Sequence, residues 1–235
     1  MGNECCGEIT KGEEDIQAIW GQLKVIDFTY ADFQTKMLEF LSSKSLTNDN
    51  AEFSYLTRDQ LTEFSKAYIF NPNDENLYKS YHSYLISKLI MGRDKVKVTQ
   101  LLFTLFPLFK EDSNKYLNFY ELINILENSK LTYEKLKFHF NAYLDIALFA
   151  FTTLIYESPS CDEAFKKEIA YIFENYITTN NKARFTDYIF VSYENTDNKD
   201  MKSSTIIDKE EYSKIFFGSR RFFNLKPLRD EFFDM

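Results

Sequence analysis

Apolar residues recur every three or four positions along most of the chain, a spacing that places them on one side of an α-helix. One run, from Val98 to Phe109, carries no charge, and another follows from Leu122 to Leu126. The longest helical pattern extends from Leu131 to Tyr156 and is apolar nearly all round after Ile146, which indicates burial on several sides. Further helices are predicted over residues 13–23, 28–41, 56–70, 76–91, 162–176, 183–194 and 208–217. The pattern therefore predicts an all-α fold with no sheet larger than a short two-stranded bridge.

Twelve residues, KEDSNKYLNFYE, separate the apolar run that ends at Phe109 from the one that begins at Leu122. This spacing resembles the helix–loop–helix of the EF-hand superfamily, whose calcium loop has twelve positions. In that register the ligand positions hold Asp112 at three, Asn114 at five, the Tyr116 carbonyl at seven, Asn118 at nine and Glu121 at twelve. The resemblance thus implies an EF-hand-like unit from Val98 to Ser129.

The chemistry of this loop departs from the family pattern at two positions. Lys110 stands where the first oxygen ligand should be, and Lys115 replaces the glycine of position six. We therefore expect a vestigial loop that holds no metal. Two alternatives stay open: weak calcium binding through Asp112, Asn114 and Glu121, and an ordinary helical hairpin with a polar turn.

The same resemblance can be followed along the chain as paired helix–loop–helix units in two lobes. A first unit would place Leu56 at the position of the β-bridge and Gln60 where the bidentate glutamate belongs. The helices on either side of Ser158 would form a third unit with a tight turn, and in a fourth unit Ile207 and Glu211 repeat the spacing of positions eight and twelve. The expected lobes cover residues 15–130 and 131–219, followed by a tail over 220–235 whose paired phenylalanines need a surface to cover, either on their own lobe or on a partner.

The N-terminus reads MGNECCG and resembles a dual acylation signal. Gly2 would carry a myristoyl chain, and Cys5 or Cys6 a palmitoyl chain, because a single acyl chain holds a protein only marginally at a membrane. The family pattern has Ser or Thr at position six, where this chain has Cys6. Residues 1–14 are therefore expected to form a flexible, acylated N-terminus, and a disordered end with incidental cysteines is the alternative.

Composition narrows the class of protein. Lys and Arg number 28 against 36 Asp and Glu, a net charge of −8, so no positive field attracts nucleic acid. With 24 Phe and 16 Tyr but only 6 Gly and 4 Pro, long helices with aromatic seams are favoured over turn-rich β-sheet proteins. The Phe, Tyr, Asn and Lys bias resembles that of AT-rich genomes such as those of ciliates. Three cysteines make no disulfide framework, which predicts an intracellular chain, and no apolar run approaches the ~20 residues of a membrane span.

The sequence contains no Walker loop, no GxSxG elbow, no zincin helix and only 2 histidines, so we expect neither an enzyme nor a small-molecule substrate. The helix pattern and the N-terminus are similar to those of calcineurin-B and neuronal-calcium-sensor proteins. That resemblance implies a membrane-tethered adaptor at the cytoplasmic face that binds an amphipathic helix of a partner protein without a cofactor. The alternatives are a structural component of a large assembly such as the microtubule-based ciliary axoneme, and a weak calcium sensor.

Overall fold

The computed structural model describes residues 24–46, 51–70, 82–83, 85, 89, 92–157, 161–175, 177–197 and 202–233. Over these residues the protein is mostly helical and has one small two-stranded sheet, which confirms the predicted all-α class. The elements in its N-terminal part are η1 (Lys24–Asp27), α2 (Tyr30–Ser43), η2 (Ala51–Phe53), β1 (Tyr55–Thr57), α3 (Arg58–Phe64), the π-helical turn η3 (Ser65–Ile69), β2 (Lys95–Lys97), α5 (Val98–Leu105) and η4 (Phe106–Leu108). The remaining elements are α6 (Lys115–Leu126), α7 (Tyr133–Glu157), α8 (Glu163–Asn175), α9 (Thr179–Asp197), α10 (Lys209–Ile215), η5 (Arg220–Phe223) and α11 (Leu225–Phe233).

Side-chain caps set where several helices begin. The Thr29 hydroxyl accepts from the backbone N–H of Asp32, whose carboxylate accepts from the Thr29 N–H in return, so α2 starts at a capping box. Thr57 and Gln60 form a second box at the start of α3. Asp208 caps α10 through the N–H of Glu211 at 2.8 Å.

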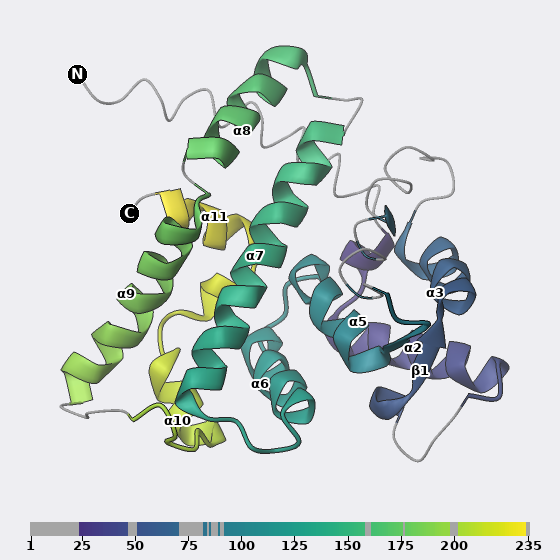
Figure 1. Cartoon of the computed structure of the whole chain (residues 1–235), viewed down its shortest axis with the longest axis horizontal. Helices are drawn as coiled ribbons and strands as arrows, with labels where there is room; N and C mark the ends of the chain where they lie inside the picture. Colours follow the sequence, from purple (N-terminus) through teal and green to yellow (C-terminus); the bar gives the residue numbers. More distant parts are fainter. Residues whose placement is uncertain are drawn as a thin grey trace.

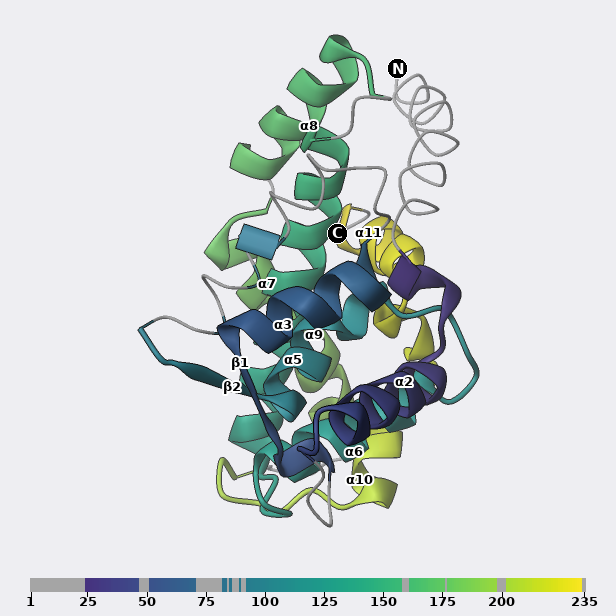
Figure 2. The same cartoon turned by 90° about the vertical axis from the view of Figure 1, so that its right-hand side faces the viewer.

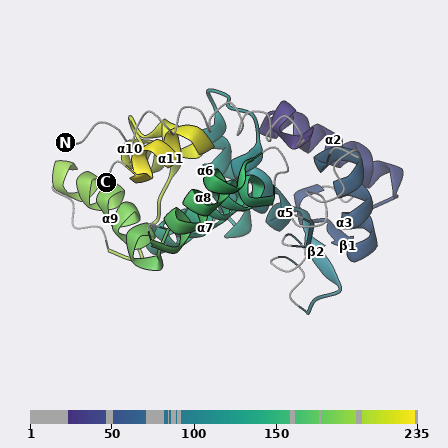
Figure 3. The same ribbon diagram turned by 90° about the horizontal axis from the view of Figure 1, so that it is seen from above.

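The elements form two groups joined by central helices. Seen from above, α2, α3, β1 and β2 lie at one end, α9, α10 and α11 lie at the other, and α5, α6 and α7 lie between them (Figure 3). The long helix α7 crosses the middle of the molecule, and α8 packs beside its C-terminal part (Figure 1). One continuous core runs through both groups.

Two short antiparallel contacts tie together helices that are distant in sequence. Strands β1 and β2 lie side by side (Figure 2), with Leu56 paired to Val96 and both side chains fully buried. At the other end of the molecule an isolated bridge joins Thr132 to Ile206. The sheet among the described residues has two strands, in agreement with the sequence.

Aromatic rings connect the two groups through α5 and α6. The Phe106 ring lies 5.7 Å from Tyr30 of α2, 5.4 Å from Phe119 of α6 and 6.3 Å from Tyr143 of α7. The Phe119 ring lies in turn 5.0 Å from Phe223 of η5. Most of these pairs are tilted or edge-on, the arrangements that aromatic quadrupoles favour. The aromatic excess of the sequence is thus used largely in the core.

Candidate functional site

The stretch that resembles a calcium loop is only partly a loop. Helix α6 begins at Lys115, so only Lys110 to Asn114 connect Phe109 to it. The predicted twelve-residue loop up to Glu121 is therefore wrong in its extent, because Lys115 starts a helical face that continues into the core through Phe119 and Leu122. The number of residues fits a calcium loop, but Lys115 to Glu121 form the first two turns of helix α6.

The four vestigial ligand residues do not converge on one point. The Asp112 carboxylate accepts from the Asn114 N–H at 2.6 Å, which closes a local turn before α6. Within α6, the Tyr116 carbonyl accepts a hydrogen bond from the buried Tyr212 hydroxyl, and Glu121 pairs with Lys209 at 3.3 Å. Asp112, the Tyr116 carbonyl and Glu121 thus bond to three different groups of the protein and do not act as a shared ligand set.

Lys115 occupies the centre of this region and is only 2% exposed. Its Nζ donates to the carbonyls of Phe109 at 2.8 Å and Pro107 at 3.4 Å, and it lies 5.7 Å from the centre of the Phe106 ring. The carbonyls belong to the end of η4 and the residue after it, where a helical segment leaves carbonyl oxygens without partners. Lys115 therefore fastens the end of the α5–η4 segment to the start of α6.

Burial lowers the pKa of the Lys115 amine from 10.5 to about 7, and the nearby carboxylates of Glu111 and Asp112 oppose this shift only in part. A neutral amine has two hydrogens, and two carbonyl oxygens stand within reach of Nζ. The site therefore accommodates the neutral amine, because each of its two hydrogens can be donated to a carbonyl oxygen. The sequence carries a signal for this burial, since Lys115 shares a helical face with Phe119 and Leu122, but the loop match concealed it.

A group of tyrosines holds α6 against α10. Tyr212 is fully buried, its ring stacks on Tyr116 with centroids 6.3 Å apart, and its hydroxyl donates to the Tyr116 carbonyl. Tyr120 donates to the Ile207 carbonyl at 3.3 Å, and the Arg220 guanidinium lies 4.7 Å above the Tyr116 ring. Burial raises the pKa of Tyr212 well above its usual value, so the hydroxyl stays a donor across the physiological range. These contacts join residues far apart in the chain, so no motif or spacing in the sequence indicates them.

Main-chain hydrogen bonds reinforce the bridge between Thr132 and Ile206. The Tyr133 N–H donates to Thr205 at 2.9 Å and the Ile207 N–H donates to Leu131 at 3.0 Å. Leu131 and Ile207 are 1% and 2% exposed, so they lie opposite each other in the core as Leu56 and Val96 do. Both contacts therefore place a buried apolar pair immediately before a helix.

Four positions after Leu56 and after Ile207, a side-chain oxygen accepts a hydrogen bond from the protein. Gln60, which follows Leu56, accepts at Oε1 from the Thr57 N–H at 2.8 Å. Glu211, which follows Ile207, accepts from the hydroxyl of Tyr193 on α9. In these two loops the acceptor that would face a cation is bonded to a donor of the protein.

Lys135 holds the equivalent position after Leu131 and forms an ion pair with Glu127. The same carboxylate bonds His139 Nε2 at 2.8 Å, and the Phe103 ring lies edge-on to the imidazole at 5.6 Å. Partial burial raises the pKa of Glu127, but the hydrogen bonds and charges of Lys135 and His139 outweigh that effect and hold the pKa below its ordinary value. Glu127 thus remains ionised and links the end of α6 to the first turns of α7.

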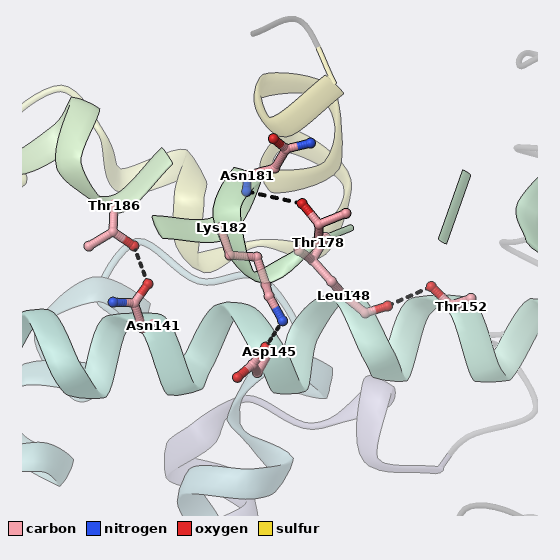
Figure 4. A network of polar contacts seen from close by, with 8 residues as sticks. All are labelled: Asn141, Asp145, Leu148, Thr152, Thr178, Asn181, Lys182 and Thr186. Carbon is pink, nitrogen blue, oxygen red and sulfur yellow. Dashed lines mark hydrogen bonds and ion pairs between the residues drawn. The ribbon is translucent and has the colours of Figure 1, made fainter. Parts of the chain in front are cut away.

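A ladder of polar side chains joins α7 to α9. Lys137 pairs with Asp187 at 2.8 Å, Asn141 accepts from the Thr186 hydroxyl at 2.6 Å, and Asp145 pairs with Lys182. Figure 4 shows the Asn141 and Asp145 contacts on one side of α7, with Thr178 and Asn181 closing the start of α9. The spacing of four residues along α7 places these contacts in one row. We assign them to helix packing, since each group has a partner in the row.

The predicted lipidation sites Gly2, Cys5 and Cys6 lie outside the described residues, as does the helix predicted at 13–23. Among the residues that are described, no helix is long and apolar enough to cross a membrane. Nor do three or more His, Cys, Asp or Glu side chains within this described part gather in a way that could hold a metal ion.

Comparison with known proteins adds no relative. No family model matches the chain, and neither a curated protein nor a solved structure matches it. The interpretation of the site therefore depends on the contacts described above.

Proposed function

We propose that this chain is a non-catalytic, EF-hand-like adaptor that is tethered to a membrane through its N-terminus and binds a helix of a partner protein. The observation that carries the proposal is the repeated contact in which two successive helix pairs meet through buried residues, Leu56 with Val96 and Leu131 with Ile207. In the EF-hand resemblance this is the place of the short bridge that joins two loops. It occurs once in each half of the chain.

In this proposal the second and third units are shifted by one helix from the sequence-based expectation, whereas the first and fourth keep their places. The first two are α2–β1–α3 and the segment in which residues 82, 83, 85 and 89 are helical, followed by β2 and α5. The third is α6 with α7, and the fourth is α9 with α10. Helix α5 thus ends one unit and α6 begins the next, so the stretch from Val98 to Ser129 is a junction between units rather than a unit itself.

The bonding at the ends of the loops supports an adaptor that does not respond to calcium. A sensor needs its twelfth-position oxygen free to take the cation and move. Here Gln60 bonds its own helix cap, Glu211 bonds Tyr193, and Lys135 places an ammonium group on Glu127. With donors of the protein in these places, the helix pairs would be held in one arrangement whether or not calcium is present.

The membrane tether rests on the sequence MGNECC, and it separates this proposal from a structural role in an assembly such as the axoneme. Metabolic labelling of intact cells with myristate and palmitate analogues tests it directly. The adaptor should incorporate both labels, and Cys5 with Cys6 changed to Ser should lose only the palmitate. A chain without either label would contradict the tether and favour the structural role.

Partner binding is tested by cross-linking the full-length protein in its own cell, in parallel with calcium and with a chelator. The proposal expects the same partner under both conditions, linked through a helical segment. A partner that is captured only with calcium would contradict the calcium-independent mode.

A further inference from the structure

The C-terminal segment from Ser219 to Phe233, which we call the tail, lies in a groove lined by α6, α7, α9 and the end of α10. Its η5 and α11 parts bury Phe222, Phe223, Leu228 and Phe232 to 5% exposure or less. Figure 1 shows α11 between α9 and α7. The sequence left open whether the tail covers its own lobe or a partner, and in this structure it covers its own lobe.

The aromatic residues of the tail contact each wall of the groove. The Phe223 ring lies 5.0 Å from Phe119 of α6, 5.7 Å from Tyr143 of α7 and 5.3 Å from Phe216 at the end of α10. The fourth wall is α9, where the Phe185 ring lies 5.2 Å from Phe222 and 5.7 Å from Phe232. A short helical segment enclosed in this way by apolar side chains has the form of a helix bound in a groove.

Polar contacts also join the tail to the groove. The Tyr143 hydroxyl donates to the Phe222 carbonyl at 3.0 Å, and Arg220 lies above the Tyr116 ring. The ion pair of Arg221 with Glu231, at 2.6 Å, joins two residues of the tail itself. Part of the polar bonding of the tail is therefore internal and would be kept if the tail left the groove.

Two further features indicate a boundary between the tail and the rest of the protein. Phe217 is 82% exposed, and Gly218, with φ +79°, turns the chain where side chains are disfavoured, so an open turn precedes the tail. In addition, the buried Oδ1 of Asn224 meets no hydrogen-bond donor among the residues that the structure describes. A buried acceptor without a donor weakens the fit of the tail to its groove.

We propose that the tail is an internal ligand that occupies the partner groove, and that the partner helix displaces it. This inference rests on the proposed function and specifies its ligand. The partner would be an amphipathic helix with adjacent aromatic residues at the positions of Phe222 and Phe223, apolar residues at those of Leu225, Leu228 and Phe232, and a basic residue at that of Arg220. Tethering favours the tail over a free helix, because it raises the local concentration of the tail at the groove.

The test uses the full-length chain with a protease site inserted between Phe217 and Gly218, in the exposed turn. After cleavage, a labelled peptide of residues 217–235 should exchange into the groove, as measured by fluorescence anisotropy, while the helical circular dichroism signal and thermal unfolding of the body are retained. The uncut chain should bind the peptide at least about tenfold more weakly, because its own tail competes.

Matched peptide variants identify the binding mode. Phe223→Ala in the peptide should weaken exchange at least about tenfold, because this ring fills the centre of the groove. Phe217→Ala should leave it unchanged, because this side chain is exposed. The inference is overturned if the peptide does not exchange into the cut chain, if the two variants behave alike, or if release of the tail unfolds the body. If the tail exchanges but no cellular partner is captured, the inference about the tail is supported and only the proposed function is contradicted.

Discussion

The buried amine of Lys115 should make the stability of the protein rise with pH above neutrality. Its pKa in the folded protein is about 7 against 10.5 in the unfolded chain, so between these values the unfolded state binds more protons. As the pH rises through this range the unfolded chain loses that proton, so the free energy of unfolding increases. The full shift corresponds to roughly 5 kcal/mol.

The usable window lies between about pH 7.5 and about pH 9.5. Over it the contribution of Lys115 to the free energy of unfolding should grow by about 2 kcal/mol, or about 4–8 °C in Tm for a chain of this size. Higher pH is avoided because burial raises the pKa of Tyr143 and Tyr212 above 10.0, so ionisation of the unfolded tyrosines lowers stability there.

The assay is chemical unfolding at a series of pH values, followed by circular dichroism, for the unchanged protein and for Lys115→Met. The variant keeps the length of the side chain but has no proton to lose, so the rise of about 2 kcal/mol should disappear. Lys110→Met, which changes an exposed neighbour, should retain the rise. Equal pH slopes for the unchanged protein and Lys115→Met would refute the account of the buried amine.

Gly2→Ala should move the protein from the membrane fraction to the supernatant on detergent-free fractionation, because palmitoylation follows the first acyl anchor; unchanged partitioning would contradict the tether. Tyr212→Phe should lower the free energy of unfolding by about 1–2 kcal/mol, because it removes the buried hydrogen bond to the Tyr116 carbonyl. Its control is Asp145→Asn, which breaks the partly exposed pair with Lys182 and should change stability by less than about 1 kcal/mol in urea unfolding. A loss for Tyr212→Phe no larger than the control would show that this hydrogen bond contributes little.

Much of the fold follows from the sequence because helix periodicity and caps are local signals. Thr29 and Asp208 mark the starts of α2 and α10, and the long apolar pattern predicts α7 within a few residues. The EF-hand resemblance also places Leu56 in a β-bridge, and the structure pairs it with Val96.

The site was harder to predict because its contacts join residues distant in sequence. Whether Lys115 begins a helix or completes a loop depends on the carbonyls of Phe109 and Pro107, which only the packing of η4 on α6 brings to it. Tyr212 meets Tyr116 across almost a hundred residues. Comparing residue types with the ligand positions of a calcium loop takes no account of secondary structure. It therefore gave no indication that helix α6 begins at Lys115.

The central claim, that donors of the protein fill the places of calcium, is tested most directly by calorimetric titration of the full-length protein with calcium, paired with thermal unfolding. The account predicts no saturable heat and an unchanged Tm at millimolar calcium, because Gln60, Glu211 and Glu127 are already bonded to Thr57, Tyr193 and Lys135. A functional site with a Kd of about 10 μM would instead stabilise the protein by about 2.7 kcal/mol at 1 mM calcium. Saturable heat together with a rise of Tm of about 5–10 °C would contradict the account.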